Sequence, residues 1–461
     1  MFAESEASSI EPPIETLSER RRFKASLVLL TVWLLVVALH VFPVARWAVV
    51  GLAAIMAVYA VRFIAMLPVV PPTTLPASSG TPAAPNSTTT AEVPLISLLV
   101  PAKNEGAVLP ALLQTLSQLD YPAERFEVWV IDDASTDHTA ECVAAWQTRF
   151  PQLHVYRREA GASGGKSGAL NEVLPLTQGD IIGVFDADAA VPVDLLQRSL
   201  PLFESEAVMA VQVRKAIANR DVNIWTWGQS IEMALDSYFQ QQRVAVGGLS
   251  ELRGNGQLVR RSALEKVGGW NEATVTDDLD LTLRLHLLGG DIAFLMTPPV
   301  LEEGVTDGVS LWHQRNRWAE GGYQRYLDYW PSILNNHLGT AKTLDLTLFL
   351  FIQYLLPIAI VPDFLLTAFR THQPALWPLS LVFAVMTLVA LSMGSRRALG
   401  LRGTSLGLAI VGGSIYMLHW IPVMVATTAR MCVRPKRLKW VKTLHEGGYY
   451  DLADEVEVAE V

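Results

Sequence analysis

Long apolar runs at both ends of the chain, on either side of a more strongly charged middle, most restrict what this chain can fold into. The first two runs cover residues 25–42 and 47–67, with a short turn over 43–46 between them. Each is close to the roughly 20 residues that an α-helix needs to cross a bilayer core. We therefore expect a transmembrane helical hairpin at 25–67 that anchors a soluble domain.

A basic cluster directly before the first run sets the expected orientation. Residues 1–24 form a polar N-terminal tail that ends in Arg20, Arg21, Arg22 and Lys24. Basic residues beside membrane segments stay in the cytosol, so the tail is expected there and the hairpin returns the chain to that side. A cleaved signal peptide is the alternative, which the second apolar span and the lack of an evident small-residue cleavage site disfavour.

The middle of the chain predicts a linker followed by an α/β domain. Residues 68–93 are rich in Pro, Ser, Thr and Ala, which predicts a flexible linker. Residues 94–310 alternate helical patterns with β-rich runs, namely LISLLVPA, FEVWVIDDA, LHVYRRE, GDIIGVFDAD and AVMAVQVRKA. This alternation predicts a doubly wound, mainly parallel sheet with helices on both faces, in which ligands bind at the carboxyl ends of the strands.

The C-terminal part predicts an interfacial segment at 311–342, a membrane region at 343–429 and a cytosolic tail at 430–461. The membrane region holds three apolar runs, near 343–369, 376–393 and 405–429. Three crossings would leave the basic tail outside, against the positive-inside rule. We therefore expect one run to lie in the interface or to re-enter, and Pro357 and Pro362 make the first run the most suspect.

Composition narrows the function. Hydrophobic residues make up 51% of the chain and charged residues 18%, and the net charge of -9 argues against nonspecific nucleic-acid binding, which needs a basic surface. Cys142 and Cys432 are the two cysteines. A disulfide framework is therefore not expected, and a reducing cytosolic face is favoured for the domain.

Acidic residues follow two of the predicted strands. Asp132 and Asp133 come after one, and Asp186 and Asp188 after another. Such residues often serve turns and helix caps, but a carboxylate at a strand tip can also accept hydrogen bonds from a uracil imide or a ribose hydroxyl. Along an extended chain Asp186 and Asp188 project to the same side, where two hard oxygen ligands suit Mg²⁺ or Mn²⁺ bridged to a diphosphate.

The segment AGASGGKS at 160–167 is one residue short of a phosphate-binding P-loop, because Ala160 stands where the first glycine belongs. This near match makes a nucleoside triphosphatase an alternative class. A P-loop joins a buried strand directly to a helix, whereas LHVYRRE ends in charged residues. We therefore favour a loop in which Lys166 steadies a donor diphosphate.

Thr276, Asp277 and Asp278 open a segment with leucines at helical spacing. Acidic residues are common at a helix N-terminus for electrostatic reasons alone. The functional interpretation makes Asp278 a general base that takes the proton of an acceptor hydroxyl in a site that excludes water. Asp277 or Asp280 could serve instead on these grounds.

The segment 311–330, LWHQRNRWAEGGYQRYLDYW, places Tyr323, Tyr326 and Trp330 at helical spacing among arginines. An aromatic and basic helix directly before apolar runs is typical of a bilayer interface. We expect these aromatic residues to serve as anchors.

The motifs DDASTD, KSGALN, DAD, RGNGQLVRR, TDD and QRNRW, in this order, closely resemble those of inverting family 2 glycosyltransferases with membrane-embedded ends, such as cellulose, hyaluronan and poly-N-acetylglucosamine synthases. The resemblance covers roughly residues 94–330 and implies a GT-A fold, a UDP-sugar donor and a divalent metal, Mg²⁺ with Mn²⁺ as the alternative. The family usually has Thr-Glu-Asp, so Asp277 shortens one carboxylate and leaves Asp278 in place.

The resemblance also implies roles for single residues. Asp278 is implied as the base, and Asp186 and Asp188 as metal ligands. Donor binding is implied for Asp133, Lys166, Asp186, Gln314, Arg317 and Trp318. Acceptor binding is implied for Gly254, Asn255, Gly256 and Trp318.

Within that superfamily, RGNGQLVRRSALEKVGGWNE, TDDLDLTLRLHLLG and LWHQRNRWAEGGYQRYLDYW are most similar to cyanobacterial β-monoglucosyldiacylglycerol synthases. This implies transfer of glucose from UDP-glucose to 1,2-diacylglycerol in glycolipid synthesis, on the cytosolic face of a plasma or thylakoid membrane. A processive polysaccharide synthase shares every catalytic motif and is the alternative enzyme, although it needs a path for polymer through the membrane. A nucleotide-sensing module fused to anchors is the nonenzymatic alternative.

Overall fold

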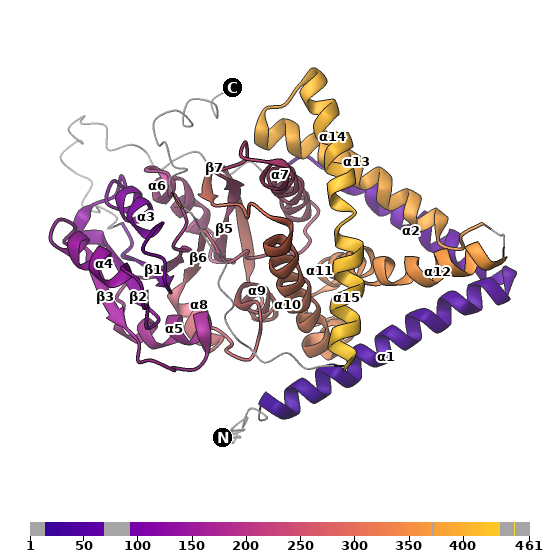
Figure 1. Ribbon diagram of the computed structural model, residues 1–461, viewed down its shortest axis with the longest axis horizontal. Helices are drawn as coiled ribbons and strands as arrows, with labels where there is room; N and C mark the ends of the chain where they lie inside the picture. The colour runs from indigo at the N-terminus through magenta and orange to yellow at the C-terminus, as the bar shows by residue number, and fades with distance from the viewer. Residues whose placement is uncertain (1–13, 69–92, 371–372, 434–446, 448–461) are drawn as a thin grey trace.

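The computed structural model describes residues 14–68, 93–370, 373–433 and 447. The predicted linker and much of both tails lie outside these residues. Figure 1 shows a domain of sheet and short helices beside a group of long apolar helices, with α7 (Ile224–Ala245) and α10 (Gly308–Leu334) between the two parts.

A seven-stranded sheet forms the centre of the domain, in the order β3-β2-β1-β4-β6-β5-β7. Only β6 runs antiparallel to its neighbours, β4 and β5, and the other pairs are parallel. The strands are β1 (Ile96–Ala102), β2 (Phe126–Asp132), β3 (Leu153–Arg157), β4 (Ile181–Val184), β5 (Val208–Ile217), β6 (Gln257–Arg260) and β7 (Asp291–Glu302). The predicted mainly parallel α/β sheet is confirmed.

Helices cover both faces of the sheet because successive strand residues point to opposite sides. Leu98 of β1 packs into a core with α3, α4 and α6, and Leu99 packs into a second core with α5, α8 and α9. These helices are α3 (Leu109–Leu116), α4 (Thr139–Gln147), α5 (Gly165–Val173), α6 (Leu195–Ser199), α8 (Arg261–Lys266) and α9 (Asp277–Leu287).

The acidic motifs meet at one edge of the sheet. Strands β2 and β4 run parallel to β1 on either side of it, so Asp132 and Val184 end their strands at the same edge. Strand β6 is antiparallel to β4 and therefore begins there, which brings the preceding segment 247–256 to the same place. This edge is where open α/β sheets bind their ligands.

Five stretches of the described chain are long and apolar enough to cross a membrane, by length and composition. They are Leu17–Val41, Pro43–Ala65, Thr340–Phe369, Trp377–Leu399 and Gly403–Val433. Many of their apolar side chains face outward, as with Leu34 (59% exposed), Ile55 (61%) and Val58 (72%). Such surface would be costly in water, which indicates that these helices associate with a membrane.

The first helix starts earlier than expected. Helix α1 (Ile14–Val41) includes the basic cluster, which the sequence places in a polar tail, and α2 (Arg46–Ala65) follows it. Arg21 forms an ion pair with Asp328 of α10 at 2.6 Å, and Lys24 donates to the Leu327 carbonyl at 2.5 Å. Through these contacts the charged first turns of α1 bind to the domain. Such contacts between distant residues cannot be seen in the apolar periodicity of the sequence.

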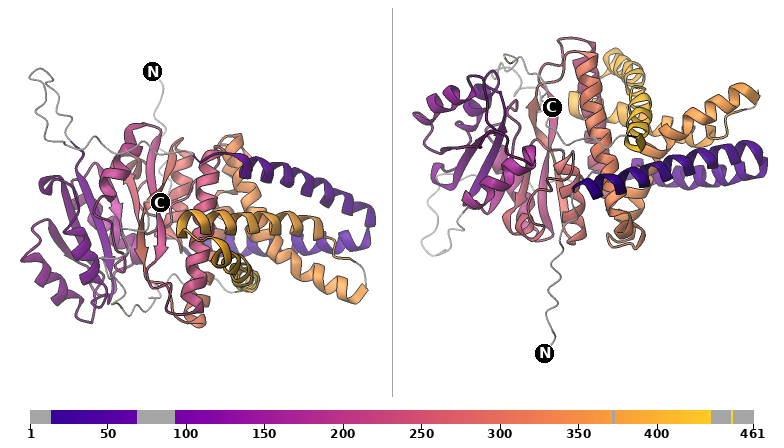
Figure 2. Two further views of the ribbon diagram at one scale, coloured as in Figure 1. Left: turned by 90° about the horizontal axis from the view of Figure 1, so that it is seen from above. Right: turned by 60° about the horizontal axis from the view of Figure 1, so that its bottom comes forward.

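Of the three C-terminal apolar runs, only the second forms a single uninterrupted helix in the described residues. Helices α11 (Thr340–Leu350) and α12 (Leu356–Arg370) join through the π-helical turn Phe351–Leu355, which precedes Pro357. Helix α13 (Trp377–Leu399) is uninterrupted. The last run divides into α14 (Gly403–Met417) and α15 (Trp420–Val433). In Figures 1 and 2, α1, α2 and α12 extend away from the sheet, whereas α15 lies across them beside α10.

Candidate active site

Lys166, in the first turn of α5, contacts the segment that follows β4. Its Nζ donates to Oδ1 of Asp186 at 2.5 Å. The helix begins after Gly164, whose φ of +81° lies in the left-handed region that glycine tolerates best. Residues 158–164 separate α5 from β3, an edge strand with exposed residues. The loop therefore lacks the direct strand-to-helix junction of a P-loop, which disfavours the triphosphatase alternative.

Asp186 and Asp188 do not lie on an extended strand. The expectation that strand alternation projects their side chains to the same side is therefore wrong. Strand β4 ends at Val184, and the Ala189 amide donates to the Asp186 carbonyl at 3.0 Å and closes a turn. Asp186 faces Lys166, whereas Oδ2 of the buried Asp188 accepts from the Glu303 amide at 3.1 Å. The turn, and not the pleat of a strand, sets how the two carboxylates are presented.

The Asp133 carboxylate is buried between two cations. Arg158 Nη1 donates to Oδ1 at 2.6 Å, and Lys103 Nζ donates to Oδ2 at 2.8 Å. The same Arg158 donates to the carbonyls of Ser163 and Gly165, which lie just before Lys166. The guanidinium therefore ties the end of β2 to the loop that carries Lys166. Sequence reasoning missed Arg158 and Lys103, although both directly follow parallel strands at the same edge.

Asp278, at the N-terminus of α9, faces Gly254. A side chain at Gly254 would place its Cβ 3.3 Å from Oδ2 of Asp278 and 3.9 Å from Nζ of Lys166. Gly254 also has φ of +82°, so both its backbone conformation and the close approach favour glycine. The structure therefore brings Asp278, Lys166 and Asp186 together around one point, as the sequence led us to expect.

The charges in this site act on one another. Burial, and then the neighbouring Asp277, raise the pKa of Asp278 to about 6. Burial by itself would lower the pKa of Lys166, but Asp186 and Asp277 outweigh it and raise that pKa, so Lys166 stays protonated. A carboxyl group with a raised pKa beside a fixed cation is typical of a general base. Asp280 does not share this position, because it is buried and pairs with Arg284 at 2.6 Å. Asp277 does lie close enough to act on Asp278 and Lys166.

Asn255 and Gly256 are not placed to touch an acceptor. Asn255 is fully buried; its Oδ1 accepts from the Asp186 amide at 3.3 Å, and its Nδ2 donates to Glu302 at 3.3 Å. Gly256 donates its amide to the Val184 carbonyl at 3.0 Å inside the sheet. Both residues support the loops around the site, so among these three only Gly254 directly approaches Asp278 and Lys166.

Helix α10 carries Gln314, Arg317 and Trp318, all half-buried. Burial lowers the pKa of Arg317, and the Asp186 and Asp278 carboxylates oppose this shift, so Arg317 lies within electrostatic reach of both. The helix thus adds a second cation near these carboxylates.

Trp318 is held by a buried ion pair that sequence reasoning missed. The Arg315 guanidinium lies 4.1 Å from the Trp318 ring centroid and donates to Oε1 of Gln314 at 2.5 Å. Its charge is paired with Glu232 of α7 at 2.5 Å, and Trp420 Nε1 of α15 donates to the same carboxylate at 2.8 Å. The last apolar run therefore contributes to positioning the signature residues on α10.

The donor set fits a divalent metal that draws other ligands from substrate. In the described parts of the chain, no three His, Cys, Asp or Glu side chains are grouped as a metal site. Asp186 and Asp188 supply hard carboxylate oxygens, which Mg²⁺ and Mn²⁺ prefer, and Mg²⁺ is often bound by one or two carboxylates plus phosphates and water. The two residues thus fit such an ion only together with a diphosphate.

Comparison with known proteins agrees with this geometry. The family model described as "Glycosyltransferase like family 2" matches residues 94–321. The "Beta-monoglucosyldiacylglycerol synthase" of Synechocystis sp. is 52% identical over 435 residues, which cover 93% of this chain and 89% of the relative. The chain belongs to glycosyltransferase family 2. The protein of the same description from Nostoc sp. is 50% identical over 433 residues, covering 93% and 90%.

This glycosyltransferase also shares its fold with a solved structure. The mannosyltransferase PcManGT from Pyrobaculum calidifontis, in complex with GDP-Man and Mn²⁺, matches with a TM-score of 0.54 and 21% sequence identity, over 84% of this chain and 99% of that one. At this identity the likeness concerns the fold alone. With the family match, it confirms the expected GT-A type domain flanked by apolar helices.

Proposed function

We propose that this glycosyltransferase transfers glucose from UDP-glucose to 1,2-diacylglycerol with inversion, which gives β-monoglucosyldiacylglycerol. The observation that carries the proposal is the position of Asp278 against Gly254, opposite the Lys166–Asp186 pair, in a chain whose near-full-length relatives are synthases of this lipid. The names of the relatives support glucose as the sugar and diacylglycerol as the acceptor. The chemistry of the transfer follows from the site.

Asp278 would take the proton of the acceptor hydroxyl as that oxygen attacks the anomeric carbon of the sugar. Its pKa of about 6 leaves it ionised at neutral pH yet more basic than an ordinary aspartate. Attack on the face opposite the leaving UDP inverts the anomeric centre. The sugar would therefore lie between Asp278 and the cations Lys166 and Arg317.

The leaving diphosphate needs positive charge on its own side of the sugar. Lys166 and Arg317 would supply it, and Lys166 is protonated because its acidic neighbours raise its pKa. A divalent ion held by Asp186 and Asp188 would, when bound, offset further charge on the departing diphosphate. Asp133 would accept from the uracil imide or ribose with its remaining lone pairs, at the end of β2.

The acceptor would enter from the membrane side, past Trp318. This ring is flanked by Arg315 at 4.1 Å and by Lys215 at 5.4 Å from its centroid, on a helix that directly precedes the apolar segments. Diacylglycerol partitions into the bilayer with its hydroxyl near the headgroups, where an aromatic and basic helix also belongs. A lipid hydroxyl at this level would approach Asp278 along α10.

For the membrane topology we propose four crossings, made by α1, α2, the joined α11 and α12, and α13. The last run is the best choice for an interfacial segment, in place of the first, because it divides into α14 and α15 and α15 lies beside α10 (Figure 1). Four crossings return the chain to the cytosol. In support, the Gly447 amide donates to Glu303 on the catalytic domain at 3.1 Å.

The experiment that tests the function is to supply purified full-length protein with labelled UDP-glucose, Mg²⁺ and diacylglycerol, and then to analyse the organic phase. A single labelled glucolipid is the expected product. Polymer formed without added diacylglycerol would instead establish the alternative, a processive polysaccharide synthase. Binding of UDP-glucose with no release of UDP would point to a nucleotide-sensing module.

A further inference from the structure

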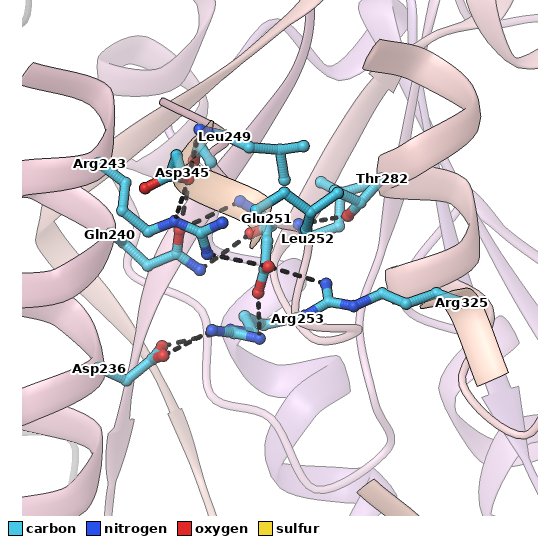
Figure 3. Close-up of polar contacts among 12 residues, drawn as sticks. Asp236, Gln240, Arg243, Leu249, Glu251, Leu252, Arg253, Thr282, Arg325 and Asp345 are labelled. Carbon is cyan, nitrogen blue, oxygen red and sulfur yellow. Dashed lines mark hydrogen bonds and ion pairs between the residues drawn. The ribbon is translucent and has the colours of Figure 1, made fainter. Parts of the chain in front are cut away.

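A fully buried carboxylate lies at the junction between the catalytic domain and the membrane helices. Glu251 is bound by three guanidinium groups, as Figure 3 shows. Its Oε1 is 2.9 Å from Arg243 Nη1 and 2.7 Å from Arg325 Nη1, and its Oε2 is 2.8 Å from Arg253 Nη1. Burial alone would raise the pKa of Glu251, but the guanidinium groups, Arg243 foremost, lower it far below its usual range. Glu251 is therefore ionised.

Two further acids complete the charge balance of this cluster. Asp236 of α7 pairs with Arg253 at 2.6 Å, and Asp345 of α11 pairs with Arg243 at 2.8 Å. Together with Glu251 they supply three negative charges against three positive ones. Buried charges are tolerated when they are paired with opposite charges, as they are here.

Helices of the membrane region take part in the cluster directly. The Tyr59 hydroxyl of α2 donates to Oδ1 of Asp345 at 2.7 Å, and Oδ2 of Asp345 also accepts from the Leu249 amide at 3.0 Å. A continuous line of polar contacts thus runs from α2 through Asp345 and Arg243 to Glu251. None of these residues belongs to the motifs of the catalytic site.

The other end of the line is the segment 247–256, which reaches the catalytic site. This segment has no regular helix or strand, so individual contacts with neighbouring elements hold it in position. The Arg253 side chain contacts Glu251 and Asp236. Its backbone amide donates to Oε1 of Gln212 at 2.6 Å. The next residue, Gly254, faces Asp278.

We propose that Glu251 is a positioning residue for glycosyl transfer. Its ion pairs with Arg243, Arg253 and Arg325 hold the 247–256 segment so that Gly254 lies against Asp278. Through Asp345 and Tyr59 the membrane helices share in setting that position. This inference rests on the proposed role of Asp278 as the base. Small misplacements of reacting groups can cost about a hundredfold in rate, so a contact that Glu251 never makes with substrate still matters for turnover.

The test compares full-length variants in membranes that supply acceptor lipids, with UDP release counted per UDP-binding site. Glu251→Gln keeps the shape and removes the charge, and we expect about a tenfold to hundredfold loss of turnover with the UDP dissociation constant within about twofold of wild type. Glu251→Asp restores the charge and should recover part of the loss. A cluster that served stability alone would lower the number of binding sites and leave turnover per site unchanged.

Tyr59→Phe keeps the proposal testable if Glu251→Gln does not fold, because it removes one hydroxyl at the membrane end of the line. We expect a loss of turnover of about twofold to tenfold, the usual effect of one hydrogen bond. Its matched control is Tyr121→Phe, which removes the bond from Tyr121 to the Pro94 carbonyl, 2.6 Å, elsewhere in the domain.

Three outcomes are distinguished. Lower turnover in Glu251→Gln and Tyr59→Phe, with Tyr121→Phe like wild type, supports the positioning role. Wild-type turnover per site in Glu251→Gln, or a Tyr59→Phe variant equal to Tyr121→Phe, overturns it. UDP release by wild type with no glucosylated diacylglycerol would overturn the proposed function instead, and would leave the comparison between variants valid.

Discussion

Lys166 Nζ and Asp186 Oδ1 lie 2.5 Å apart, which joins the first turn of α5 to the turn after β4. The pair brings a fixed cation to the carboxyl edge of the sheet, within 3.9 Å of the position that a Gly254 Cβ would occupy. A donor diphosphate would compete with Asp186 for this ammonium group. In doing so it would free the carboxylate for a metal ion.

Replacing Lys166 with methionine should therefore weaken donor binding. The variant keeps the length of the side chain and loses its charge-assisted hydrogen bonds, which are worth roughly 1.5–3 kcal/mol, so UDP affinity should fall by about tenfold to a hundredfold. Titration calorimetry with UDP and Mg²⁺ measures this change. Unaltered affinity would remove Lys166 from the donor site.

The rate should rise with pH through about 6, because Asp278 must be ionised to act as the base. Asp277→Asn removes the negative charge that helps to raise the pKa of Asp278, so the ionised form becomes easier to reach and the acidic limb of kcat/KM should move to lower pH. Asp221→Asn is the control, since Asp221 is an exposed acid outside the site. A limb that stays in place in Asp277→Asn, or that moves equally in both variants, would argue against Asp278 as the titrating group.

Removal of divalent ions should abolish turnover, and Mg²⁺ or Mn²⁺ should restore it. Asp188→Asn retains an oxygen that can accept from the Glu303 amide at 3.1 Å, so the turn should persist while the charge on the metal ligand is lost. We expect the rate to fall by at least about a hundredfold, the equivalent of several kcal/mol of charge stabilisation. Full activity in chelator, measured as glucolipid formed, would contradict the assigned metal site.

The contact between Trp420 and Glu232 should matter for catalysis although Trp420 lies in the last apolar run. Trp420→Phe removes the bond from Nε1 to Glu232, 2.8 Å, and loosens the carboxylate that holds Arg315 under Trp318. A loss of about 1–3 kcal/mol from a buried carboxylate should lower turnover by about fivefold to a hundredfold. Trp377→Phe, at a half-exposed tryptophan of α13, is the control and should behave like wild type in the same assay.

Sequence patterns predicted those parts of the molecule that depend on local periodicity. The apolar runs before Asp132 and Asp186 stand out in the sequence, and parallel pairing of both strands to β1 then places the two aspartates at one edge. The order of short motifs supported the role of Asp278. The structure adds that Asp278 faces Gly254, an approach that depends on β6 running antiparallel to β4.

The features that sequence reasoning missed depend on partners far apart in the chain. Glu232 pairs with Arg315 across 83 positions and with Trp420 across 188, so no local pattern marks it. The turn at Asp186 was also missed, because alternation assumes that the strand continues. The composition around the basic residues of α1 predicts a polar tail, whereas Arg21 is bound to Asp328 of α10.

The most direct test of this account compares the lipid product of wild type with that of Asp278→Asn, both reconstituted in bilayers with UDP-glucose, Mg²⁺ and diacylglycerol. The anomeric proton coupling of the purified glucolipid reports its configuration. We expect wild type to form a single β-glucoside, and Asp278→Asn to form it at least about a thousandfold more slowly while binding UDP normally. An α-glucoside, or substantial activity in Asp278→Asn, would contradict the account.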